Sequence, residues 1–169
     1  MAQEILTPNL LQTNVGPFRD FNGNPLIPTL EDLSDGNSGT GIQTDSNTVA
    51  TINFSFTSPL FTTFDTAILQ YRIEELASGG KGTIITTFSL SAIPIETFNG
   101  SEVPAGTIEE VDIGNLSIEQ INNGIFGFNI SNTPNITRIS EVKIILTITG
   151  GQVRITQGKI NLKKGKILI

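Results

Sequence analysis

The sequence predicts an all-β fold, a β-sandwich or jelly roll built around one core. Thr, Ile, Val and Phe are plentiful, and Gly (17) and Asn mark the turns. Apolar residues recur at every second position in several short segments, as expected for strands that bury one face. Turn signals separate these segments at intervals typical of sandwiches. With 169 residues and 37% apolar content, the chain has room for one ordinary domain.

The stretch from Thr66 to Ser91 carries the clearest strand signal. Two alternating segments are joined by the glycine-rich run 78–82 (SGGKG), where glycine permits a positive φ and a chain reversal. We therefore predict that the two segments pair as a hairpin to which the other strands are added. The predicted inward side chains are Ala67, Leu69, Tyr71 and Ile73 in the first segment and Ile84, Thr86, Phe88 and Leu90 in the second.

Further strands are predicted over residues 49–56, 107–112, 125–131 and 139–149. Residues 92–106 contain two prolines and are predicted to be a connection. Residues 115–123 are predicted to form a short helical turn that Ser117 caps and Gly124 ends. The predicted inward side chains of the three alternating strands are Ala50, Ile52, Phe54, Phe56, Phe126, Phe128, Ile130, Val142, Ile144, Leu146 and Ile148.

Residues 1–35 are predicted to be an extended arm outside the core, followed by a sandwich body over 36–150. Prolines at positions 8, 17, 25 and 28 fix φ and cannot donate to a strand ladder. The short apolar patches between them need cover, so the arm is expected to run over the domain surface or over a neighbouring subunit. In the loop 32–41, side-chain oxygens offer a calcium site as an alternative, but their spacing favours turns with Asx hydrogen bonds.

Residues 151–169 form a third region with a period of seven. Its units are GQVRI, GKINL and GKILI, and each predicts a strand too short to be stable alone. The units could stack, zigzag, intertwine with other subunits or recur by chance. This region holds five bases and no acid, whereas residues 1–150 hold five bases and all sixteen acids. We favour a tail that docks on an acidic neighbour or is simply solvated over a tail that binds a polyanion, and we expect no nucleic-acid partner.

The composition excludes much catalytic chemistry. The chain has no Cys and no His, which removes thiol nucleophiles, thiolate metal sites and the commonest general base. The paired acids 74–75 and 109–110 face opposite sides of a strand, and one Tyr without Trp makes a poor sugar platform. We predict that the chain is not an enzyme, binds no cofactor, and has no catalytic, cofactor-binding or metal-binding residue. A hydrolase that uses carboxylates alone is the weakest alternative.

The chain shows no membrane or export signal that we recognise. No apolar run reaches the roughly 18 residues of a membrane-spanning helix. The N-terminal residues MAQE lack the basic and apolar regions of a signal peptide. We therefore expect synthesis in a bacterial-type cytoplasm, no secretory export and no membrane partner.

Three motifs between Leu33 and Thr149 form a broader pattern: a loop at 33–35 (LSD); a strand at 68–73 (ILQYRI) before a Gly-rich turn and a Thr/Ile strand; and a turn at 117–121 (SIEQI) before 128–130 (FNI) and 142–144 (VKI). This pattern resembles small jelly-roll domains of tailed-bacteriophage virion proteins, especially from phages of cyanobacteria. The resemblance implies a jelly-roll or galactose-binding-like sandwich in the virion, as a capsid decoration (cement), tail or fibre component, with a trimer favoured. It transfers no ligand-binding residue.

We predict a non-enzymatic structural virion protein that oligomerises and docks on other virion proteins through its two end segments. The alternative is a carbohydrate-binding module for host-surface attachment, whose candidate ring platforms are Phe61, Phe64, Tyr71 and Phe98. The candidate subunit or partner contacts are the apolar residues Ile5, Leu6, Leu10, Leu11, Leu26, Ile27, Val153, Ile155, Ile160, Leu162, Ile167 and Ile169.

Overall fold

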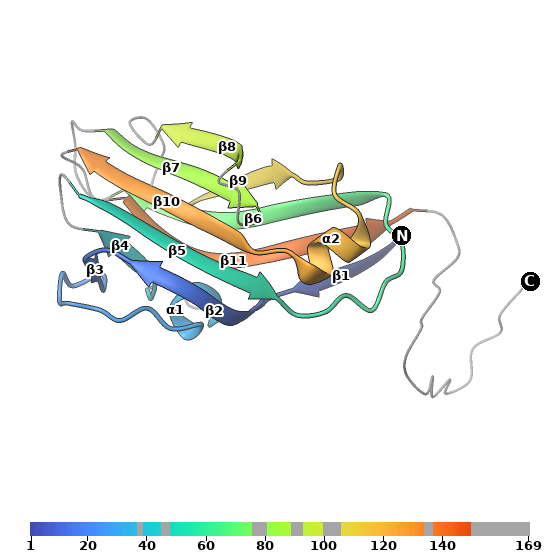
Figure 1. Ribbon diagram of the computed structural model, residues 1–169, viewed down its shortest axis with the longest axis horizontal. Helices are drawn as coiled ribbons and strands as arrows, with labels where there is room; N and C mark the ends of the chain where they lie inside the picture. Colours follow the sequence, from blue (N-terminus) through green and yellow to red (C-terminus); the bar gives the residue numbers. More distant parts are fainter. Residues whose placement is uncertain are drawn as a thin grey trace, which may run out of the picture.

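The computed structural model describes residues 1–36, 39–44, 48–75, 81–88, 93–99, 106–133 and 137–149. These residues form two antiparallel sheets packed face to face, which confirms the predicted all-β sandwich (Figure 1). The six-stranded sheet has the order β3 (Phe18–Arg19), β4 (Ile42–Thr44), β11 (Thr137–Ile148), β6 (Thr66–Glu75) and β9 (Thr107–Asp112), and β1 (Ala2–Leu6) also pairs with β11.

The second sheet lies in front of the first in Figure 1. Its five strands, in spatial order, are β2 (Pro8–Val15), β5 (Val49–Phe56), β10 (Phe126–Thr133), β7 (Lys81–Phe88) and β8 (Ile93–Asn99). Two short helices accompany the sheets: α1 (Glu31–Ser34), which buries Leu33, and α2 (Ile118–Asn123), which buries Ile121.

The alternation read from the sequence is confirmed wherever the side chains are described. Along β5, for example, every second residue from Ala50 to Phe56 is buried. Phe88 is half-buried, and Ile84 and Leu90 lie outside the described side chains. The other predicted inward residues are buried: Ala50, Ile52, Phe54, Phe56, Ala67, Leu69, Tyr71, Ile73, Thr86, Phe126, Phe128, Ile130, Val142, Ile144, Leu146 and Ile148.

An aromatic cluster joins the two layers. Tyr71 comes from the six-stranded sheet, and its ring centroid lies 4.9 Å from that of Phe128 in the five-stranded sheet. Phe128 also packs 5.5 Å from Phe54. The Thr86 hydroxyl donates to the Tyr71 hydroxyl at 3.5 Å, so the polar end of the buried tyrosine has a partner across the core.

The predicted hairpin between β6 and β7 is wrong. β6 pairs with β11 and β9, whereas β7 pairs with β10 and β8 in the other sheet. A strand that buries one face shows the same alternation whether its neighbour in sequence pairs with it or lies in the opposite layer. Residues 76–80, within and just before the predicted turn, lie outside the described residues.

The predicted connection 92–106 contains a strand, β8. This strand pairs with β7 and lies at the edge of its sheet, where Pro94 is tolerated because an edge strand leaves half of its backbone donors unused. The proline signal therefore identified an edge rather than a loop.

The predicted helical turn is confirmed as α2. The Gln120 N–H donates to the Ser117 hydroxyl at 3.1 Å, and the Ser117 N–H donates to the Gln120 side-chain oxygen at 2.8 Å. These two bonds form a capping box. Gly124 follows the helix with a negative φ of −77°, so it is no left-handed cap. Glycine fits at this position because a Cβ there would overlap the Phe88 ring.

Residues 1–35 are built into both sheets. β1 pairs with β11, and β2 pairs with β5. The expectation that this segment stays outside the core is wrong, because Leu6, Phe18 and Leu33 are buried. Proline is tolerated in a strand at the edge of a sheet, and β2 is such an edge strand.

Candidate binding surfaces

In the loop 32–41, where a calcium site was the alternative, the carboxylates accept hydrogen bonds from nearby threonines. Asp32 accepts from the Thr29 N–H at 2.7 Å and from its hydroxyl at 2.8 Å, and Asp35 accepts from the Thr40 hydroxyl at 2.6 Å. Across the described ranges, no group of three or more acidic side chains is placed to hold a metal ion. None of the helices in that part of the chain has the length and apolar character needed to cross a membrane.

The two sheets differ in charge. Three neighbouring strands of the five-stranded sheet, β2, β5 and β10, contain no Asp, Glu, Lys or Arg (PNLLQTNV, VATINFSF, FGFNISNT). In the six-stranded sheet, β6 and β11 carry both signs of charge, with Arg72 and Lys143 among them, and β9 carries acids such as Glu110. The outer face over β2, β5 and β10 therefore offers no counter-charge to a charged ligand.

We call this surface the neutral face. It consists of the outward side chains of β2, β5, β10 and β7 that the structure describes and that bear amide or hydroxyl groups, together with one glycine. Alternation places the members on β5, β10 and β7 outside, because their neighbours along these strands are buried or half-buried. The register with Asn53 places Thr13 of β2 on the same face. Its members are Thr13, Thr51, Asn53, Ser55, Thr87, Gly127 and Asn129.

One row of the neutral face crosses four strands in register: Thr13, Asn53, Gly127 and Thr87. The Asn53 amide donates to the Thr13 hydroxyl at 2.7 Å. A Cβ on Gly127 would overlap the Asn53 carboxamide oxygen and lie 2.9 Å from the Thr87 hydroxyl. Glycine is therefore needed at this position for Asn53 and Thr87 to lie close over β10.

Neighbouring rows continue the same chemistry. The Asn129 amide donates to the Thr51 hydroxyl at 3.5 Å, and the Ser55 hydroxyl donates to Asn9 at 3.1 Å. Each carboxamide has two donors and an acceptor, and each hydroxyl donates once and accepts twice. The neutral face therefore keeps donors and acceptors beyond those used in its own side-chain contacts.

The ring platforms proposed from the sequence do not lie on this face. Tyr71 is fully buried, so it is wrong as a ligand platform. Phe61 and Phe64 are half-buried against the core. The Phe98 side chain lies outside the described side chains.

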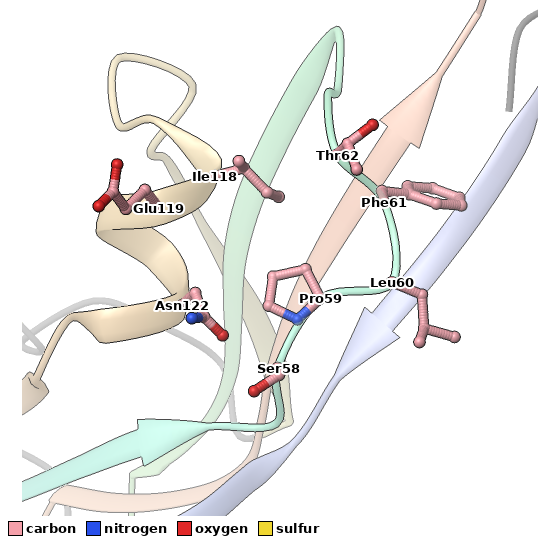
Figure 2. A pocket seen from close by; sticks show the side chains of 8 residues that line it. All are labelled: Ser58, Pro59, Leu60, Phe61, Thr62, Ile118, Glu119 and Asn122. Carbon is pink, nitrogen blue, oxygen red and sulfur yellow. The ribbon is translucent and has the colours of Figure 1, made fainter. Parts of the chain in front are cut away.

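A separate pocket of about 490 Å³ lies between residues 58–62 and α2. Figure 2 shows the side chains of Leu60 and Phe61 directed away from α2, while Ile118 points toward the loop. Glu4 of β1 holds the loop, accepting the N–H groups of Leu60 at 2.6 Å and Phe61 at 2.9 Å. Phe61 lines the pocket, but its ring is directed away from α2. Its lining residues are Ser58, Pro59, Leu60, Phe61, Thr62, Ile118, Glu119 and Asn122.

The predicted partner contacts of the N-terminal segment divide into three groups. Leu6 is 1% exposed and belongs to the core, so its assignment to a contact surface is wrong. Leu11 and Leu26 are half-buried against the core. The exposed members are Ile5 (58%), Leu10 (53%) and Ile27 (83%). The other candidates, Val153, Ile155, Ile160, Leu162, Ile167 and Ile169, lie outside the described residues.

Ile5 does not stand alone on the six-stranded sheet. Its backbone is in register with Ile145 of β11, which is in register with Ile68 of β6. All three side chains point outward, since their neighbours Leu6, Ile144 and Leu69 are buried. Ile108 of β9 is a further exposed apolar side chain on this sheet, beside the polar and charged side chains Gln70, Arg72 and Lys143.

No protein-family model matches the sequence, and no curated protein matches it. Among solved structures, the chain is similar to a family GH115 4-O-methyl-α-glucuronidase, BtGH115A, with specificity for decorated arabinogalactans, at 9% identity and a TM-score of 0.40. That match covers 83% of this chain and 18% of the glucuronidase, so the chain spans under a fifth of that protein.

The chain is also similar to the family 11 carbohydrate-binding module of the cellulosomal cellulase Lic26A-Cel5E of Clostridium thermocellum. The identity is 11%, the TM-score is 0.38, and the match covers 90% of this chain and 92% of the module. We base the functional argument on the surface of the chain itself.

Proposed function

We propose that the chain is a non-enzymatic carbohydrate-binding β-sandwich, with the neutral face as its binding surface. The observation that supports this most is the row Thr13, Asn53, Gly127 and Thr87, which joins four strands without a charged side chain. The glycan would lie across the strands, over the Asn53 and Thr87 side chains that come together above Gly127.

The chemistry of the neutral face matches a neutral glycan better than a charged ligand. Sugar hydroxyls donate and accept hydrogen bonds, as do the carboxamides and hydroxyls on this surface. An ionic ligand would lose hydration here without gaining a counter-charge. A nucleic acid would need lysines and arginines for its phosphates, and β2, β5 and β10 have none.

The same surface predicts weak binding at each site. The phenylalanines of β5 and β10 point into the core, so the neutral face has no ring among its described side chains to stack on a sugar. Hydrogen bonds exchanged against water contribute little net free energy each. Useful attachment to a glycan-covered surface would then come from several copies binding together.

A glycan array probed with the full chain, presented multivalently, tests the proposal. We expect binding to neutral glycans and none to sulfated or sialylated ones. Binding confined to acidic glycans, or to none, would contradict it. Attachment to a host surface, implied by the phage resemblance, is part of the same proposal and is tested with intact host cells.

A second candidate function is a structural virion protein that assembles as a trimer and docks on other virion proteins. The exposed apolar side chains of Ile5, Leu10 and Ile27 favour it, because apolar surface gains free energy when a partner covers it. Light scattering of the full chain checks the assembly. A trimer whose mass falls to that of a monomer in the Ile5→Asn/Ile27→Asn variant supports this function, and a monomeric wild-type chain contradicts it.

A further inference from the structure

We propose that the pocket between residues 58–62 and α2 binds one small neutral molecule that carries several hydroxyl groups, such as a single sugar. The pocket shares no residue with the neutral face, and the proposal stands whether or not that face binds a glycan. Its volume of about 490 Å³ lies within the range of sites for small ligands, about 300–1,000 Å³.

Hydrogen bonds fix both walls of the pocket before a ligand arrives. On the loop side, Glu4 accepts the N–H groups of Leu60 at 2.6 Å and Phe61 at 2.9 Å, one on each carboxylate oxygen. On the helix side, the capping box between Ser117 and Gln120 fixes the first turn of α2. A site that is already formed loses little conformational entropy on binding, so a few contacts can give a measurable affinity.

Polar groups from the two walls meet in the pocket. Figure 2 shows the Asn122 carboxamide of α2 and the Ser58 hydroxyl of the loop directed toward each other. The Asn122 amide donates to the Asn123 side-chain oxygen at 3.2 Å, which leaves its second N–H and its own oxygen for a ligand. A carboxamide and a hydroxyl can both donate to and accept from the hydroxyl groups of one small molecule.

Apolar side chains supply the rest of the contact. Figure 2 shows Ile118 directed from α2 toward the loop, with the Pro59 ring on the loop side of the same space. A pyranose ring carries C–H groups on its faces and hydroxyls around its edge. It can therefore contact Ile118 and Pro59 by dispersion while its hydroxyls bond to Asn122 and Ser58.

The charge of the lining disfavours ionic ligands. Glu119 is the one charged residue among the described residues that line the pocket. An acidic sugar would approach this carboxylate and lose hydration without gaining a counter-charge. Figure 2 shows the Glu119 carboxylate directed away from the loop, so a cation held between the two walls would gain little from it. A neutral ligand avoids both costs.

Titration of the isotope-labelled full chain with the methyl glycosides of glucose, galactose and mannose tests the proposal by amide chemical shifts. We expect at least one glycoside to shift the amides of residues 58–62, apart from Pro59, and of residues 118–122, with a dissociation constant of about 1–10 mM. Asn122→Ala should weaken this binding about fivefold. The control Asn115→Ala, at an exposed asparagine outside the pocket, should leave it unchanged. Thermal melting confirms that both variants fold.

Three results would overturn the proposal. The first is the absence of shifts around the pocket with all three glycosides. The second is a set of shifts confined to Thr13, Asn53 and Thr87, which would place the sugar on the neutral face. The third is binding of glucuronate or glucosamine at the pocket at least about tenfold tighter than that of the neutral glycosides, which would assign recognition to charge. Shifts at the pocket together with a negative glycan array would support this site and remove the neutral face.

Discussion

The five-stranded and six-stranded sheets bury the same aromatic core, but their outer faces differ in charge. On the neutral face, the Asn53 and Asn129 amides donate to the hydroxyls of Thr13 and Thr51. On the six-stranded sheet, Gln70 of β6 bonds to Glu110 of β9, and Lys143 and Arg72 are nearby in register. The inner faces are alike because both must fill one core.

This difference separates two kinds of recognition within one fold. A neutral surface selects ligands by hydrogen-bond geometry, and salt affects it little. A charged surface attracts ligands of opposite charge, and salt weakens the attraction. The shared core, the neutral face and the difference in charge between the two faces can each be tested separately.

The largest effect is expected in the core that both faces share. Phe128→Ala removes a fully buried ring that contacts Tyr71 and Phe54 and should lower the free energy of unfolding by about 3–5 kcal/mol. Urea unfolding measures it. The surface control Val15→Ala, at a side chain that is 68% exposed, should change stability by less than about 0.5 kcal/mol. A loss below about 1 kcal/mol for Phe128→Ala would mean that the two sheets do not depend on this contact.

A smaller loss is expected where the neutral face is most closely packed. Gly127→Ala places a methyl group against the Asn53 carboxamide and should cost about 1–3 kcal/mol of folding free energy. The control Gly114→Ala meets the flexible Asp112 side chain at 3.0 Å and should cost less. Thermal unfolding of both variants compares them, and equal losses would contradict the close approach of Asn53 to β10.

Ionic strength should distinguish the two faces. The affinity for a neutral glycan should change by less than about twofold between 0.05 and 0.5 M salt, because no charge of the neutral face takes part. Calorimetric titration at both salt concentrations measures it. A fall of tenfold or more would place the ligand on the charged side of the molecule.

The smallest effect is expected from low pH on Asp20, which follows the edge strand β3 of the six-stranded sheet. The Asn24 side chain, together with backbone N–H groups of Asn24 and Asn22, donates to Asp20 and lowers the pKa of that carboxyl below its ordinary value of 3.8. Its stabilising contribution is therefore present above the pKa of the unfolded chain and is lost as the pH falls through the folded-state pKa. Carbon-detected NMR titration should show Asp20 protonating below 3.8, and a value at or above 3.8 would contradict these bonds.

Much of the fold could be predicted because burial of one face leaves a period of two in the sequence. That period identified β5, β6, β10 and β11, and local cap chemistry identified α2. It could not assign β6 and β7 to different sheets, since the pattern is the same for either neighbour. It also changes within β11, where a β-bulge with Glu141 at φ 55° brings both Ile139 and Val142 inward.

The candidate site was harder to predict than the fold. The lack of charge in residues 49–56 and 126–131 is visible in the sequence, and it was the available signal. That β2, β5, β10 and β7 lie side by side depends on pairing between distant segments, which one sequence does not reveal. The prolines in residues 1–35 and 92–106 suggested an arm and a connection outside the sheets. These prolines instead occur in or beside edge strands.

The central claim is that the neutral face binds carbohydrate, and one calorimetric comparison tests it most directly. A neutral glycan selected by the array would be titrated into the wild-type chain, the Asn53→Ala variant and the Gln70→Ala variant, which removes a carboxamide from the opposite face. We predict that Asn53→Ala weakens binding about tenfold, equivalent to about 1.4 kcal/mol, and that Gln70→Ala leaves it unchanged. Unchanged affinity in Asn53→Ala, with a loss in Gln70→Ala, would contradict the assignment and move the site to the six-stranded sheet.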